Sequence, residues 1–169
     1  YKYPRRVISI LAVNRYGVLA RISNMFNRRS FNIDSITTSE TMDPGIANIT
    51  ITVHVDEQKL KQLLLQTRRL EDVREVYELA TASVQRELLL IKVRADKDNL
   101  PSLRDIAGVY KAKIIDLSPD SLVMELTGKP EKVEGFLNMM RNYEVLEMCR
   151  TGITALERGT DHIFGDEEE

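Results

Sequence analysis

The sequence predicts an α+β protein built from two modules that share the element order β-α-β-β-α-β. Short apolar, β-branched runs typical of strands alternate with runs whose apolar residues recur every three or four positions, as in helices. This order occurs twice along the 169 residues, and the polar segment 81–86 separates the two copies. We therefore predict a first module over residues 1–80, a second over 86–158 and an acidic tail over 159–169.

The first module opens with an apolar strand over residues 7–13 and a helix that begins near Val18. The apolar residues of this helix share one face: Val18, Leu19, Ile22, Met25 and Phe26. The remaining elements are an extended stretch, a turn, an alternating strand, a helix capped by Asp56 and a final strand, at 31–40, 43–45, 49–55, 56–69 and 73–79.

The second module repeats this order. Its expected strands lie at 87–95, 112–117, 122–127 and 145–151. Its helices are expected after a cap at Asp98 or Asn99 and over 133–140. A module of this order places both helices on one face of a four-stranded antiparallel sheet, the ferredoxin-like arrangement. Because the other face and the edge strands must be covered or paired, we expect a homo-oligomer.

Composition excludes several classes of partner and compartment. The formal net charge is −2, which gives no basic face for nucleic acid. Apolar runs such as 88–91 are far shorter than the roughly 18 residues of a membrane span. The single cysteine, Cys149, cannot form an intramolecular disulfide, and no secretory leader pattern occurs. We therefore expect a cytoplasmic protein that binds neither nucleic acid nor membrane.

The residue types that carry catalysis are scarce and scattered. His54 is expected on the solvent face of an alternating strand, and His162 falls in the acidic tail. Cys149 lies in an apolar strand and is expected to be a small buried residue. The sequence has no Cys-x-x-Cys metal loop, no Gly-rich phosphate loop and no stacking aromatics in the strands 7–13 and 46–55. The sequence thus predicts no catalytic, metal or RNA-binding centre.

One loop has the features of a ligand site. Residues 14–19, Asn-Arg-Tyr-Gly-Val-Leu, leave a buried strand and enter a helix. Gly17 permits a left-handed turn or close approach to a ligand, and the helix start offers free N–H groups to a carboxylate. Asn14 offers a donor and an acceptor, while Val18 and Leu19 suit an aliphatic side chain. An ordinary strand-to-helix turn would have the same composition, so both interpretations stand on these residues alone.

The stretch VNRYGVLARISNMFNRRSFNIDSIT resembles the start of an ACT domain, and is most similar to the family of small regulatory subunits of acetolactate synthase. The matching residues are Asn14, Gly17, Val18, Leu19, Arg21, Ile22, Phe26, Arg29, Phe31, Asn32 and Ile33. The resemblance continues through ELLLIKV, AKIIDLSPDSLVMELTG, KVEGFLNMM and RTGITALERG, and so spans nearly the whole chain. Ser30 departs from the glycine that is usual in the family, and it requires a negative φ or tolerated strain.

The resemblance implies a non-catalytic chain that dimerises through its ACT domains and binds a branched-chain amino acid, usually valine, at that interface. It implies that Asn14, Gly17 and Leu19 of one chain face Asn32 and Ile33 of the other, with Val18 in the same effector site. The implied partner is the catalytic large subunit, which carries thiamine diphosphate, FAD and magnesium, so none of these cofactors is expected here. The chain would activate that subunit and confer feedback inhibition in branched-chain amino acid biosynthesis.

Two other functions remain open on the sequence. The first is an amino-acid-sensing ACT module that regulates a different enzyme or a transcriptional regulator. The second is a structural adaptor that binds its catalytic partner but no effector. Saturable binding of valine, leucine or isoleucine would remove the adaptor.

Overall fold

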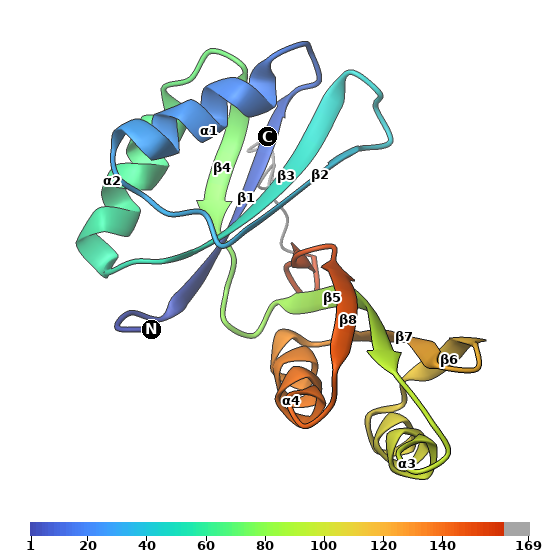
Figure 1. Ribbon diagram of the computed structural model, residues 1–169. Helices are drawn as coiled ribbons and strands as arrows, with labels where there is room; N and C mark the ends of the chain where they lie inside the picture. The colour runs from blue at the N-terminus through green and yellow to red at the C-terminus, as the bar shows by residue number, and fades with distance from the viewer. Residues whose placement is uncertain (161–169) are drawn as a thin grey trace. The chain divides into compact units, whose positions relative to one another are not determined.

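Strands and helices alternate throughout residues 1–160, the part of the chain described by a computed structural model (Figure 1). The chain forms two units, the first containing residues 1–84 together with residues 153–160, and the second containing residues 85–152. The two-module α+β fold predicted from sequence is confirmed. All of the predicted tail except Gly159 and Thr160 lies outside the described residues.

The first unit is a four-stranded antiparallel sheet in the order β2-β3-β1-β4, with both helices on one face (Figure 1). Its elements are β1 (Arg5–Val13), α1 (Val18–Arg28), β2 (Ser35–Glu40), β3 (Ile46–His54), α2 (Glu57–Arg68) and β4 (Val73–Glu78). The central pair β1 and β3 turns Ile8, Ile10, Ile49 and Ile51 toward the helices, where each is at most 1% exposed. Burial of these side chains holds the helices on the sheet.

Local hydrogen bonds define the start of α2 and the end of α1 in the first unit. The predicted cap of α2 is confirmed, since the Asp56 carboxylate accepts a hydrogen bond of 2.7 Å from the backbone N–H of Lys59. Helix α1 ends in a Schellman motif, in which Ser30 N–H bonds Asn27 O and Phe31 N–H bonds Phe26 O. The motif requires a left-handed residue, and Ser30 supplies it with φ 59°. The strain foreseen for a serine at this position is therefore present.

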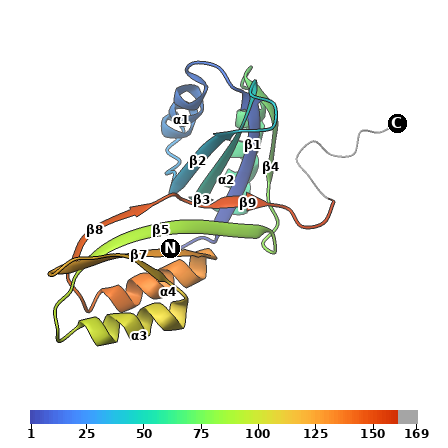
Figure 2. The ribbon, with the colours of Figure 1, turned by 90° about the vertical axis from the view of Figure 1, so that its right-hand side faces the viewer.

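The second unit repeats the arrangement, with the sheet order β6-β7-β5-β8 and both helices on one face (Figure 2). Its elements are β5 (Val84–Arg94), α3 (Leu100–Tyr110), β6 (Lys113–Leu117), β7 (Ser121–Gly128), α4 (Pro130–Met140) and β8 (Val145–Arg150). Phe136, Leu103 and Leu126 are fully buried between helices and sheet. Helix α3 ends like α1, with left-handed Lys111 at φ 58° in place of Ser30.

One single-residue expectation was wrong. Cys149 is exposed rather than buried, because β8 is an edge strand and Cys149 lies opposite Leu90, which is 38% exposed. His54 lies on the helix-free face of its strand, as the alternation predicts, but it is half-buried there. Its Nδ1 lies 2.5 Å from Asp34 Oδ2, and the Tyr1 ring stacks on it with a centroid separation of 3.7 Å.

A short strand that the sequence patterns did not predict, β9 (Thr154–Leu156), returns the chain to the first unit. Ile153 and Ala155 pack against Val7 and Leu79 in a buried cluster. Val7 and Thr37 lie on the helix-free face of the sheet, and Thr37 Oγ1 donates to Ile153 O at 3.4 Å. We call residues 153–158 the C-terminal strap. The sequence-based boundary had placed these residues with the second module.

Polar contacts fasten the strap to the outgoing chain. The Glu157 carboxylate accepts from Ala80 N–H at 2.5 Å, and Arg158 Nε donates to Ala82 O at 2.6 Å. The first unit is therefore closed by a segment that lies some 70 positions further along the chain. Its stability depends on residues from both ends of the sequence.

We predict that Ile153→Ala destabilises the first unit by about 2–4 kcal/mol, because it removes a buried side chain from the strap. Native-state hydrogen exchange should show faster exchange of the β1 and β3 amides than of the β5 and β7 amides. Leu156→Ala is the matched control in the same strap, since Leu156 is 67% exposed and its loss should cost less than about 0.5 kcal/mol. Equal effects of the two substitutions would contradict the assigned packing.

Candidate functional site

The loop from Asn14 to Gly17 connects β1 to α1 and is tied to the elements on both sides of it. On one side, Asn14 N–H donates to Gly45 O at 2.8 Å and Asn14 Nδ2 donates to Pro44 O at 2.9 Å, so the β2–β3 turn holds the start of the loop. On the other side, the N–H of Val13 donates to Asp72 O at 2.8 Å. We call residues 14–17 the effector loop.

Gly17 is the N-cap of α1 and has a left-handed backbone, with φ 82° and ψ 0°. A Cβ at this position would lie 3.0 Å from Arg21 Nη1, so a side chain would meet both backbone strain and crowding. No side chain caps the helix. Val18 N–H bonds Arg15 O and Arg21 N–H bonds Gly17 O, which leaves the N–H groups of Leu19 and Ala20 without a helical acceptor.

A pocket of about 560 Å³ opens at this corner, within the range of roughly 300–1,000 Å³ that small-molecule sites occupy. It is lined by Val13, Asn14, Arg15, Gly17, Val18, Leu19, Ala20, Ser23, Thr38, Ala47 and Ile49. The walls are mainly apolar, and Arg15 is the ionisable residue in this lining. The pocket thus combines a polar corner at the helix start with an aliphatic surface.

Four of the six predicted site residues, Asn14, Gly17, Val18 and Leu19, line this pocket. Asn32 and Ile33 do not, because they follow the opposite end of α1. A helix of 11 residues is about 16 Å long, so one chain cannot bring these two groups together around a small ligand. Their participation requires a second copy, and effector binding by all six residues stays a prediction.

Strand pairing contributes pocket residues that sequence reasoning did not single out. Thr38 and Ile49 are cross-strand partners, as are Glu40 and Ala47, and three of these four side chains line the pocket. Alternation along β3 marks Ile49 as inward-facing. Only the register of β2 against β3 places Thr38 beside it, and that register is a tertiary property.

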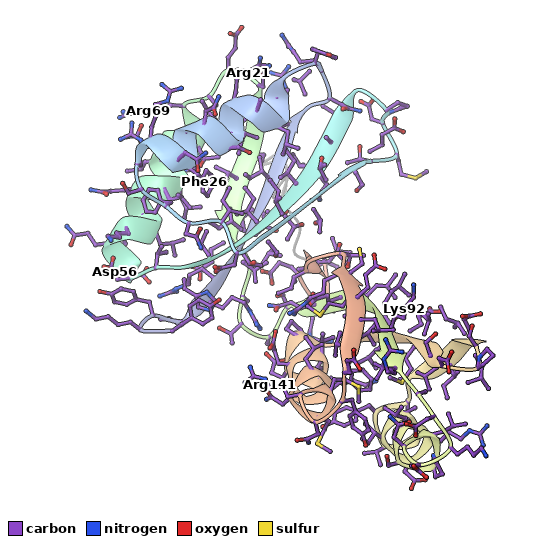
Figure 3. The ribbon with its side chains drawn as sticks, viewed as in Figure 1. Arg21, Phe26, Asp56, Arg69, Lys92 and Arg141 are labelled. Atoms are coloured by element: carbon purple, nitrogen blue, oxygen red, sulfur yellow. The ribbon has the colours of Figure 1, made fainter. Side chains whose placement is uncertain are left out.

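Asp72 is the charged centre behind the effector loop. Its side chain is 9% exposed and accepts from Arg21 Nε at 2.6 Å, while Arg15 Nε lies 3.1 Å from its other oxygen. Figure 3 shows Arg21 near the start of α1, with Phe26 on the side of the helix that faces the sheet. Two guanidinium groups meet one carboxylate, so the loop retains one excess positive charge, which favours an anionic ligand group.

The second unit holds a different ionic cluster, with Glu87 at its centre. Glu87 is 3% exposed and forms a bidentate pair with Arg150, which also reaches Glu134 on α4 at 2.9 Å. The hydrogen bond to Glu87 raises the pKa of Arg150 above its ordinary value. This cluster ties β5, β8 and α4 together, which is a structural role.

Residues 1–160 contain neither a metal-binding cluster nor a membrane-spanning helix. Among these residues no group of three or more His, Cys, Asp and Glu side chains is placed to hold a metal ion. None of the helices described here is both long and apolar enough to cross a membrane.

Comparison with known proteins agrees with the two-unit architecture. A family model described as the AHAS small subunit-like ACT domain matches residues 8–75, and one described as the small subunit of acetolactate synthase matches 86–159. The first unit is therefore an ACT-type domain. Together the two models cover most of the chain, which belongs to the family of acetolactate synthase small subunits.

Relatives with this name extend over nearly the full length. The probable acetolactate synthase small subunit of Methanothermobacter thermautotrophicus is 40% identical over 156 residues, covering 91% of this chain and 93% of the relative. The acetolactate synthase small subunit of Bacillus subtilis is 39% identical, with 92% of each chain covered. The crystal structure of the Thermotoga maritima small subunit superposes with a TM-score of 0.84 at 35% identity, covering 94% of this chain and 99% of that one.

We predict that Ser30→Gly stabilises the protein by about 1 kcal/mol, because it relieves the left-handed strain that a Cβ imposes between Phe26 and Asn32. Denaturant unfolding would measure the gain. Lys111→Gly is the matched control, since it sits in the same motif at the end of α3 and should give a similar gain in the second unit. A loss of stability at Ser30 alone would mean that its hydroxyl has a role that outweighs the strain.

Proposed function

We propose that this chain is the non-catalytic regulatory subunit of an acetolactate synthase, and that it binds a branched-chain amino acid at the effector loop. The observation that carries this proposal is the pocket at the start of α1, where left-handed Gly17 leaves two backbone donors uncapped beside an aliphatic wall. The family supports the same assignment, since its relatives are named as small subunits of that enzyme.

Different residues of the pocket suit the carboxylate, the ammonium group and the side chain of an amino acid. The N–H groups of Leu19 and Ala20 at the positive end of α1 suit the carboxylate. Asn14 uses its Nδ2 on Pro44 O, which leaves Oδ1 to accept from the ammonium group. Ala47 and Ile49 on β3 suit a short branched side chain. Valine satisfies all three requirements with the smallest side chain of its class.

A homodimer completes the site in this proposal. Strand β2 is an edge of the first sheet and leads directly back to Asn32 and Ile33. A second copy that pairs along this edge would cover unpaired backbone and bring Asn32 and Ile33 to the effector loop of its neighbour. Asn32 is exposed in a single chain, with Nδ2 bonded only weakly to Asp34 Oδ1 at 3.4 Å.

The catalytic chemistry belongs to a partner in this proposal. Thiamine diphosphate, FAD and magnesium are held by the large subunit in the cytoplasm, and this chain binds none of them. Its two activities are activation of that subunit and transmission of feedback inhibition. Both are binding equilibria, so they require two distinct surfaces but no acid or base.

Reconstitution with the cognate large subunit tests the proposal. The chain alone should form no acetolactate from pyruvate, and its addition should raise the activity of the large subunit. L-Valine should then reverse the activation in a saturable manner. Activation without any response to valine, leucine or isoleucine would leave only the structural adaptor, and absence of activation would point to another regulated enzyme.

Gly17→Asp separates the two activities, and we predict retained activation with lost inhibition. The substitution puts a Cβ into a left-handed turn, 3.0 Å from Arg21 Nη1. It also adds a negative charge close to the expected position of the bound carboxylate, where two like charges about 4 Å apart repel by roughly 4 kcal/mol at an effective dielectric of 20. Affinity should therefore fall on the order of a hundredfold or more. Gly108→Asp is the control, because it places the same charge in open space on α3. Wild-type inhibition in the Gly17→Asp protein would place the site elsewhere.

A further inference from the structure

We propose that Asp72 is the positioning residue of the effector site: acting through Arg21, it holds the effector loop in the conformation that binds the amino acid. This inference rests on the proposed function, because it concerns the affinity of the same pocket. Asp72 touches none of the pocket volume, and it is absent from the pocket lining. Its role is to fix residues that do line the pocket.

Asp72 contacts both ends of the effector loop. It lies in the turn between α2 and β4, directly before Val73. Its backbone carbonyl accepts from Val13 N–H at 2.8 Å and so fixes the last residue of β1. Its carboxylate accepts from Arg21 Nε, on the first turns of α1, at 2.6 Å, and Arg21 Nη2 lies 2.6 Å from the same oxygen. Asp72 thus contacts both the end of β1 and the start of α1, which the effector loop connects.

Arg21 transmits this constraint to the loop backbone. Its Nη2 donates to Tyr16 O at 3.3 Å, and its Nη1 occupies the space beside the Gly17 Cα, 3.0 Å from where a Cβ would lie. The guanidinium therefore packs along the two residues that precede the uncapped donors of Leu19 and Ala20. Movement of Arg21 away from Asp72 would free the Tyr16 carbonyl and loosen the left-handed turn.

Attachment of α1 to the sheet does not require this ion pair. Ile22 and Phe26 are at most 1% exposed and already anchor the helix by apolar contact. Withdrawing a carboxylate from water is costly unless cations surround it, and Asp72 has two of them, Arg15 and Arg21. We explain the cost of burying the Asp72 carboxylate by its effect on Arg15 and Arg21, whose side chains it orients. Arg15 itself lines the pocket, so its ion pair with Asp72 restrains a cationic side chain at the edge of the site.

Loss of the Asp72 charge should lower the affinity for the effector more than it lowers the stability of the fold. Asparagine keeps the size and one acceptor of the side chain but removes the charge that attracts both arginines. The loop would then populate several conformations, and the ligand would have to order it on binding. We expect the affinity of Asp72→Asn for L-valine to fall roughly ten- to thirtyfold.

Calorimetric titration of L-valine into the full chain tests this, well below the unfolding temperature. The variants are Asp72→Asn, Arg21→Gln and their double, and the matched control is Arg68→Gln. Arg68 also ties a helix to β4, by donating to Val76 O at 2.9 Å, but it lies away from the effector loop. The double variant should bind no more weakly than the weaker single variant, because both remove one interaction. Arg68→Gln should bind like the wild type.

A merely structural role predicts different results. It would lower the unfolding temperature of Asp72→Asn while leaving its dissociation constant unchanged, because titration of folded protein does not report global stability. Asp72→Glu keeps the charge and should regain affinity to within about threefold of the wild type. Arg21 is half exposed, so Arg21→Gln provides the decisive comparison even if Asp72→Asn fails to fold.

The outcomes distinguish failure of the proposed function from failure of the positioning role of Asp72. If the wild-type chain binds none of valine, leucine and isoleucine, the proposed function fails. If the wild type binds valine and both Asp72→Asn and Arg21→Gln bind it equally well, the proposed function stands and the positioning role of Asp72 is overturned.

Discussion

The left-handed backbone at Gly17 is the constraint on which the proposed effector site depends. It turns the chain from β1 into α1 without a capping side chain, and it leaves the N–H groups of Leu19 and Ala20, two residues of the pocket lining, without a helical acceptor. Any Cβ at this position would meet both the positive φ and the Arg21 guanidinium. The surrounding contacts, from Pro44 on one side and Asp72 on the other, stabilise a turn that would otherwise be one of many loop conformations.

The distance spanned by α1 is the reason that the proposed effector site requires two chains. The helix separates the donor corner at its start from Asn32 and Ile33 beyond its end, and its packing through Ile22 and Phe26 fixes that separation. Ser30 closes the helix in a strained left-handed conformation and so sets the direction in which the chain leaves toward Asn32. In the proposed dimer, the effector loop and the segment around Asn32 are two half-sites of one domain. Rotational symmetry between two copies would bring the effector loop of one chain to the Asn32 segment of the other.

Apolar runs and hydrophobic periodicity predicted the eight longer strands and the four helices of the described residues. They did not predict β9, whose three residues are too short to show a period and whose burial depends on the distant Val7. The effector loop was predicted from turn chemistry and family resemblance. Thr38 and Asp72 were not predicted from the sequence. The register of β2 against β3 brings Thr38 to the pocket, and contacts with Arg15 and Arg21 place Asp72 beside the loop. Cys149 was misplaced for a related reason, since edge position is decided by strand order.

The central claim, a site shared between two chains, is tested most directly by complementation between two inactive variants. Gly17→Asp disables the effector loop and Asn32→Ala disables the opposite half-site, so each homodimer should bind L-valine poorly. In a dimer that contains one chain of each, one site has both defects and the other has none. After the two proteins are mixed and allowed to exchange subunits, calorimetry should therefore recover about one quarter of the wild-type sites at wild-type affinity, given random pairing. No recovery, with subunit exchange confirmed by mass spectrometry, would contradict the shared site.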